Sequence, residues 1–186
     1  MELEFDDVRR LKALADYRVL DTPPESVFDN ITRLAAAIFR TPIALVSLID
    51  KERQWFKSHF GLDVTQTPRE VAFCDHAIRG SGTMVVEDAT RDARFLGNPL
   101  VTGAPFVRFY CGVPLHSSDG EGLGTLCIID RTPRTISPEE RAALEALARQ
   151  VEHELEIRRR LLLLEEALET QQTHQRAKEQ IGRAHV

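Results

Sequence analysis

The feature that most constrains the fold is the C-terminal part of the chain, where no glycine or proline occurs from Glu139 to about residue 180. Ser137 is a suitable N-cap, Pro138 fits the first helical position, and Glu140 completes a capping box. The sequence therefore predicts one long helix that begins after Ser137 and closes the chain.

The apolar spacing changes along this helix. The first part steps by three, four and four residues and should lie on a globular body: Leu144, Leu147, Val151 and Leu155. The second part steps by four, three and four, as in a heptad seam: Ile157, Leu161, Leu164 and Leu168. We expect this second part to form a parallel two-stranded coiled coil in a homodimer, with a flexible joint near Leu155. The alternative is a single solvated helix, which would leave the four leucines of 161–164 in water.

Two shorter amphipathic helices are predicted near the N-terminus. The first spans 6–16, with Val8, Leu11 and Leu14 on one side. The second spans 27–39 and follows the turn DTPPES, where two prolines prevent a helix. Its apolar stripe is expected to be Val27, Ile31, Leu34 and Ile38, widened by Phe28, Ala35 and Phe39.

The region between these helices and the long one has the patterns of strands. PIALVSLID (42–50) is almost entirely apolar and predicts a buried central strand. Further strands are expected at 53–61, 83–88, 107–115 and 123–130, of which the last two form an antiparallel hairpin. In 107–115, alternation places Val107, Phe109 and Cys111 on one face, and Arg108 and Tyr110 on the other.

The composition excludes several classes of protein. Of 186 residues, 42% are hydrophobic and 28% charged, as in a globular protein, and the net charge of −5 argues against nucleic-acid binding. No apolar run approaches the roughly 18 residues that span a bilayer, and the acidic N-terminus does not resemble a secretory signal. Three cysteines without a CxxC pair do not form a disulfide framework. We therefore expect a cytoplasmic protein.

The order of motifs closely resembles a GAF domain of the bacterial signalling type. The resemblance covers about residues 11–150 and rests on FCDHAI, VVEDATRDARFLGNPLV, RFYCGVPL and GLGTLCIIDRTPR in this order. It implies an α/β (α+β) fold, in which a central antiparallel sheet is flanked by helices, and a small-ligand pocket walled by FCDHAI and DARFLGNP. It also implies dimerisation through terminal helices and an attached output domain.

The last six residues, IGRAHV, resemble the translation of a sequencing-adapter read-through, so we expect the natural protein to continue beyond about Gln180. The expected organisation is an N-terminal helix and lead-in (1–24), the GAF domain (25–150), a coiled-coil signalling helix (151–180) and the adapter-derived end (181–186).

The reactive side chains of FCDHAI raise the question of chemistry. Cys74 and His76 supply two of the four ligands that zinc prefers, and Cys111 and His116 should face opposite sides of the sheet, so no metal site is predicted. On a helix the two side chains point about 200° apart, so His76 is badly placed to activate Cys74 as a nucleophile. We assign no catalytic residue.

The cofactor stays unknown. Bilin attachment in the phytochrome type of GAF domain uses a cysteine followed by histidine, whereas Asp75 follows Cys74 here, and the Asp-Ile-Pro motif is missing. The resemblance therefore disfavours a bilin, while a haem or a metal stays open.

The favoured interpretation of FCDHAI is a packed turn of helix. Phe73, Cys74, Ala77 and Ile78 should be core residues, and Asp75 could cap the helix. A ligand pocket is the remaining functional interpretation, with these candidates: Cys74, Asp75, His76, Asp88, Arg108 and Tyr110. The charged loop 85–95 is expected to be a salt-bridged surface, and the glycines of GLGTLC to serve a turn and close packing.

The expected function is a sensory or regulatory domain without catalysis of its own, which binds a small ligand or dimerises and signals through the coiled coil. A histidine kinase is the first choice for the output domain, on the composition of the tail, and a diguanylate cyclase is the alternative. A thiol-based redox enzyme that uses Cys74 is the alternative from another class.

Overall fold

The computed structural model describes residues 7–184, and the side chains of 7–181. Its elements follow the chain in this order: α1 (Asp7–Asp16), α2 (Ser26–Phe39), β1 (Ile43–Ile49), β2 (Arg53–Phe60), β3 (Gln66–Pro68), the 3₁₀ helix η1 (Arg69–Val71), α3 (Phe73–Ala77), β4 (Met84–Val86), α4 (Pro99–Thr102), β5 (Phe109–His116), β6 (Gly122–Asp130) and α5 (Pro138–Ala184).

One six-stranded antiparallel sheet forms the centre, in the order β3-β2-β1-β6-β5-β4. All seven residues of β1 are buried, which confirms the predicted central strand. Strands β5 and β6 pair as the predicted hairpin, with Tyr110 opposite Ile129. The sequence did not reveal β3 or α4, because each is only three or four residues long and carries no periodicity.

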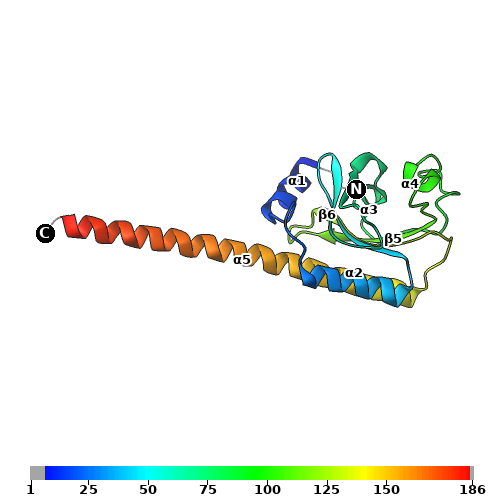
Figure 1. Ribbon diagram of the computed structural model, residues 1–186. Coiled ribbons are helices and arrows are strands. Elements are labelled where there is room, and N and C mark those ends of the chain that lie inside the picture. Colours follow the sequence, from blue (N-terminus) through cyan, green and yellow to red (C-terminus); the bar gives the residue numbers. More distant parts are fainter. Residues whose placement is uncertain (1–6, 185–186) are drawn as a thin grey trace.

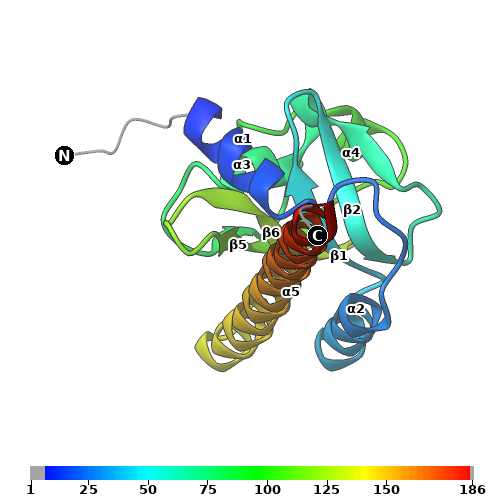
Figure 2. The same ribbon diagram turned by 90° about the vertical axis from the view of Figure 1, so that its left-hand side faces the viewer.

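The sheet separates two hydrophobic cores. Helices α2 and α5 lie side by side against its lower face, and α3 and α4 cover its upper face (Figures 1 and 2). Helix α1 lies at the end of the sheet from which α5 leaves the domain (Figure 1). The predicted central sheet flanked by helices is confirmed.

The buried faces of α1 and α2 differ from the predicted ones. Val8 is 80% exposed, so this part of the predicted face was wrong, whereas Leu14 is buried as predicted and Arg10 is buried with it. In α2, Leu34 and Ile38 are 49% and 52% exposed, so this part of the predicted stripe was wrong. The buried face is centred on the residues expected only to widen it, and small alanines let the helix approach the sheet: Phe28, Ile31, Thr32, Ala35, Ala36 and Phe39.

Strand β5 begins two residues later than predicted. Phe109 and Cys111 face the lower core and Tyr110 the upper core, as alternation required. Val107, expected on the face of Phe109, packs in the upper core instead. Its N–H group donates to the carbonyl oxygen of Leu100 at 2.8 Å, so Val107 belongs to the loop after α4 and not to the strand.

Helix α5 begins with the predicted capping box. The Ser137 N–H donates to Glu140 Oε2 at 2.8 Å, and the Glu140 N–H donates to Ser137 Oγ at 3.1 Å. The first part of α5 lies on the body as predicted, with Leu144, Val151 and Leu155 buried. The helix passes Leu155 without interruption and continues through Gly182 to Ala184; the last two residues of IGRAHV lie outside the described residues.

Candidate functional site

The FCDHA sequence forms α3, a short helix on the upper face of the sheet. Phe73, Cys74 and Ala77 are buried, and so is Ile78 directly after them, which confirms the predicted packed turn. Asp75 does not cap the helix as expected, because Ala72 occupies the N-cap position and makes no side-chain hydrogen bond.

A buried polar cluster surrounds the thiol of Cys74. The hydroxyl groups of Thr125 and Tyr110 donate to Cys74 Sγ at 3.1 and 3.3 Å. Cys127 Sγ lies 3.9 Å away, and Ser47 Oγ accepts from the thiol at 3.6 Å. All five side chains are buried, and they join α3 to three neighbouring strands of the sheet.

Two opposing effects set the ionisation of Cys74. Burial raises the pKa of this thiol, but hydrogen bonds with Cys127, Thr125 and Tyr110 outweigh burial and lower the pKa from 9.0 to about 7. Burial raises the pKa of Cys127 and of Tyr110 well above their usual values. The cluster therefore accommodates one negative charge at Cys74 more readily than at its neighbours, although Cys74 is only 2% exposed.

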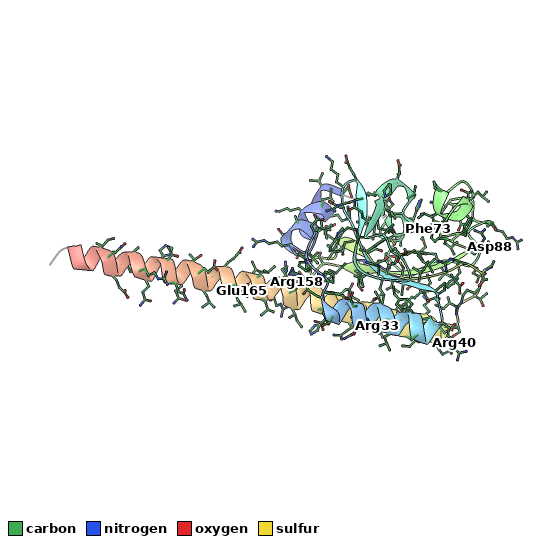
Figure 3. The ribbon with its side chains drawn as sticks, viewed as in Figure 1. Arg33, Arg40, Phe73, Asp88, Arg158 and Glu165 are labelled. Carbon is green, nitrogen blue, oxygen red and sulfur yellow. The ribbon has the colours of Figure 1, made fainter. Side chains whose placement is uncertain are left out.

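Aromatic rings fill the space above this cluster. Phe73 and Phe95 stack with ring centroids 3.9 Å apart, and Phe73 lies 5.2 Å from the ring of Tyr110. His76 contacts the edge of Phe95 at 5.0 Å, and burial lowers the pKa of its imidazole. Figure 3 shows Phe73 in the layer above the sheet. These stacked, tilted and edge contacts make the upper layer a packed core.

Asp75 belongs to a chain of ion pairs that leaves α3. Its carboxylate pairs with Arg79 at 2.9 Å and accepts from Arg69 Nε at 2.7 Å. Both terminal nitrogens of Arg69 donate to the carboxylate of Asp7 at 2.9 Å, which brings α1 into the network. Hydrogen bonds from Arg69 and Arg10 lower the pKa of Asp7 from 3.8 to about 2.

Asp88 and Arg108 make local contacts elsewhere. The carboxylate of Asp88 accepts from the N–H and hydroxyl groups of Thr90, and these hydrogen bonds lower the pKa of Asp88. Arg108 donates to the carbonyl oxygens of Val101 and Val107. Figure 3 shows Asp88 at the end of the domain away from the free part of α5. Of the six predicted pocket residues, Cys74 and Tyr110 are thus joined by a hydrogen bond. The role of all six in binding a ligand stays a prediction.

The charged loop 85–95 has the predicted character. Arg94 pairs with Asp92 through two of its nitrogens, at 3.0 and 2.6 Å, and both side chains are partly exposed. These contacts hold the loop together at the surface, and hydrogen bonds from Arg94 lower the pKa of Asp92.

A cleft that the sequence did not reveal lies between α2 and β2, with a volume of about 460 Å³. Lys57 is buried beneath it, where Nζ donates to Thr22 Oγ1 at 2.9 Å and to the carbonyl oxygen of Pro23 at 2.8 Å, and pairs with Glu25. The ammonium group of Lys57 is thus paired within the protein, whereas the exposed Arg33 also lines the cleft. No local sequence pattern predicts this cleft, because the hydrogen bonds of Lys57 join residues about 35 positions apart.

The exit of α5 from the domain carries a second polar cluster. The hydroxyl of Tyr17 donates to Glu156 Oε2 at 3.0 Å and accepts from the Ser118 N–H at 3.2 Å. Arg159 donates to Ser118 Oγ at 3.2 Å and to Glu156 Oε1 at 3.0 Å. Arg18 pairs with Glu166, about two to three turns further along α5. Helix α5 is therefore fixed to the domain at the place where it leaves.

Along the same stretch the helix presents an apolar seam to solvent. We call Ile157, Leu161, Leu164 and Leu168 the α5 seam; their exposed fractions are 39%, 55%, 60% and 57%. Figure 3 places Arg158 where α5 passes the domain, and Glu165 on the part that projects from it.

Within residues 7–184 no three side chains of His, Cys, Asp or Glu come together as metal ligands would. The helices of the same residues include none with the length and apolar character needed to cross a bilayer.

Comparison with known proteins adds to this geometry. A sequence model of the GAF domain family matches residues 23–155. A cyclic di-GMP phosphodiesterase of Pseudomonas aeruginosa is 48% identical over 134 residues, which are 72% of this chain. The chain spans only 23% of the length of that relative.

Solved structures of low sequence identity share the fold. Free methionine-R-sulfoxide reductase of Neisseria meningitidis, in complex with its substrate, is 21% identical, with a TM-score of 0.61, and the match covers 87% of this chain and 99% of that one. The GAF domain of an Acinetobacter phosphoenolpyruvate-protein phosphotransferase is 16% identical, with a TM-score of 0.60, over 81% of this chain and 93% of that one.

Proposed function

Because this chain belongs to the GAF domain family, we propose that it is the regulatory input of a homodimeric signalling protein and controls an output domain through α5. The observation that carries the proposal is the change of surroundings along one continuous helix. The first part of α5 is buried on the sheet, whereas the α5 seam is apolar, exposed and spaced as a heptad. Four large apolar side chains on one exposed helix face favour a partner helix over water.

The partner that fits this seam is the same seam of a second copy. Identical heptads match each other in register when two helices run parallel, so their leucines pack as knobs into holes. Tyr17–Glu156 connects the domain to the start of the seam and Arg18–Glu166 to its last part, so a rotation of the domain would turn the seam. Packed interfaces switch between discrete arrangements, which suits a signal.

The dimer is tested with two leucines that differ only in their place on the helix. Leu164 lies in the seam and Leu163 outside it, and they are 60% and 53% exposed. Light scattering of the purified chain should give the mass of a dimer for the wild type and for Leu163→Asp, and a lower mass for Leu164→Asp. A monomeric wild type, or equal masses for both variants, would contradict the proposal.

For the output domain we propose an enzyme of cyclic di-GMP turnover. The support is the relative from Pseudomonas aeruginosa, which carries this activity in its name and whose remaining length lies outside the match. The composition of the tail alone favoured a histidine kinase, with a diguanylate cyclase as the alternative. The relative is named as a phosphodiesterase, so it supports the same signalling molecule as the alternative but the opposite reaction.

The gene in its source, read beyond codon 180, tests this assignment. A following domain that hydrolyses or makes cyclic di-GMP, assayed in the longer protein, supports the proposal. A phosphoacceptor helix, with histidine followed by an acidic residue, would return the histidine kinase to first place.

A small ligand remains part of the proposed function, and the candidates are the six pocket residues of the sequence analysis. A ligand that reached Cys74 and Tyr110 would have to separate Phe73 from Phe95, since these rings fill the layer above the thiol. Nuclear magnetic resonance titration with small molecules tests this. Shifts centred on α3 and Tyr110 support the site, whereas shifts confined to the α2–β2 cleft would move the ligand there.

A further inference from the structure

Residues 7–19 contact both faces of the domain, and we call them the α1 strap. At one end Asp7 binds Arg69, which holds Asp75 of α3 on the upper face. At the other end Tyr17 binds Glu156 of α5 on the lower side of the sheet. The strap precedes the segment that the family model matches, which begins at residue 23.

Helix α1 is anchored to the sheet between these two ends. Arg10 is 1% exposed, and its Nη1 donates to the carbonyl oxygen of Ile49 at 2.6 Å, at the end of β1. The same nitrogen lies 3.4 Å from the carbonyl oxygen of Gly122, where β6 begins. Arg10 Nε also donates to Asp7 at 2.8 Å, so the anchor and the link to α3 share one carboxylate.

The connection from α1 to α5 is equally direct. Leu14 is buried, Tyr17 follows it within a turn, and Val19 is buried beyond it, so the backbone of the strap has little freedom to absorb a shift. Tyr17 also accepts from the Ser118 N–H, and Arg159 lies 5.1 Å from the centre of its ring. A displacement of α1 would therefore change contacts at the exit of α5.

We propose that the α1 strap couples α3 to the exit of α5, so that a change in the position of α3 alters how firmly residues 152–168 are held. The coupling deepens the proposed function, since it gives the output helix a connection to the side of the domain that bears α3. It is a free-energy coupling between two places and is therefore reciprocal: loosening either end loosens the other. The position of α1 between α3 and α5 does not by itself establish coupling, so the experiment measures the coupling directly.

Hydrogen–deuterium exchange of the whole chain provides that measurement. Asp7→Asn removes the charge that binds Arg69 and Arg10, and should raise exchange both in 73–79 and in 152–168. We expect a rise of about two- to thirty-fold, the range that side-chain coupling usually gives. The matched control is Asp92→Asn, which breaks a similar two-contact pair with Arg94 on the upper side and should raise exchange only near 90–98.

The reverse experiment begins at α5. Tyr17→Phe removes the hydrogen bond to Glu156 and should raise exchange in 73–79. Its control is Thr83→Ala, which removes a hydrogen bond of 2.6 Å to Glu145, nearer the start of α5, and should leave 73–79 unchanged.

Three outcomes would overturn the proposal. Asp7→Asn could leave 152–168 unchanged, Tyr17→Phe could leave 73–79 unchanged, or exchange could rise equally in β1 and β6, which would indicate general destabilisation. Hydrogen–deuterium exchange does not depend on the identity of the output domain. The same coupling should be measurable in a monomeric Leu164→Asp chain. Failure of the strap and failure of the dimer are therefore distinguishable.

Discussion

Phe73 of α3 and Phe95 of the loop before α4 stack face to face, with ring centroids 3.9 Å apart, and both side chains are buried. This contact joins the two segments that the GAF resemblance assigns to the wall of a pocket. The buried Cys74 cluster lies on the sheet side of the same helix. A ligand at the proposed pocket would have to open this layer.

Removal of the Phe95 ring measures how much the aromatic stack contributes to the stability of the fold. Phe95→Ala should lower the free energy of unfolding by about 3–5 kcal/mol, because it deletes a buried aromatic side chain and leaves a cavity against Phe73. Phe60→Ala is the control, since Phe60 is 40% exposed and should cost far less. Urea unfolding of both variants gives the comparison, and equal losses would show that the stack does not hold the layer.

Close packing of β6 on β1 gives a second prediction. A Cβ atom on Gly124 would lie 1.8 Å from the carbonyl oxygen of Ser47, whereas one on Gly97 would meet no heavy atom within 4 Å. Gly124→Ala should therefore destabilise the domain by on the order of 4 kcal/mol, and Gly97→Ala should change stability by less than about 0.5 kcal/mol. Thermal unfolding measures both, and a stable Gly124→Ala protein would be inconsistent with the strand register.

Thiol reactivity separates the sensory function from the redox enzyme. The lowered pKa of Cys74 favours its thiolate near neutral pH, but Cys74 is 2% exposed and Cys127 is fully buried. We expect burial to dominate, so that Cys74, Cys111 and Cys127 resist a thiol reagent until denaturant is added. Ser81→Cys, at an exposed position, is the positive control. Rapid reaction of Cys74 in the native chain would favour the thiol-based enzyme.

The pKa of Asp7 predicts how the attachment of α1 depends on pH. The folded value of about 2 lies below the ordinary 3.8, so the charged carboxylate stabilises the fold above pH 3.8, and this contribution disappears as the pH falls to about 2. The difference in unfolding free energy between the wild type and Asp7→Asn should therefore shrink over this interval. A difference that does not vary between these pH values would show that Asp7 is not bound by Arg69 in solution.

Much of the fold could be predicted because its strongest signals are local. The apolar run of β1, the turn between β5 and β6, and the capping box at Ser137 each depend on neighbouring residues, and all three were confirmed. The face of α2 was predicted less well, because two apolar stripes share that helix and only packing against the sheet selects Phe28 and Phe39 over Leu34 and Ile38.

The candidate site could be predicted only in part, for a related reason. The sequence identifies Cys74 as a core residue, but its contacts with Thr125 and Cys127 depend on how β6 is placed beneath α3. The ion pair of Asp7 with Arg69 joins residues 62 positions apart, so no local pattern announces it. Long-range polar contacts of this kind require the fold itself.

The central claim is that the α5 seam pairs with the same seam of a second copy, in parallel and in register. Cysteine cross-linking tests it most directly, because Leu164→Cys would bring two identical positions together, whereas Leu163→Cys, one residue away, would point outward. Mild oxidation followed by non-reducing electrophoresis should convert most of the Leu164→Cys chain, and little of the Leu163→Cys chain, to a covalent dimer. Equal cross-linking of the two variants, or none at Leu164→Cys, would contradict the account.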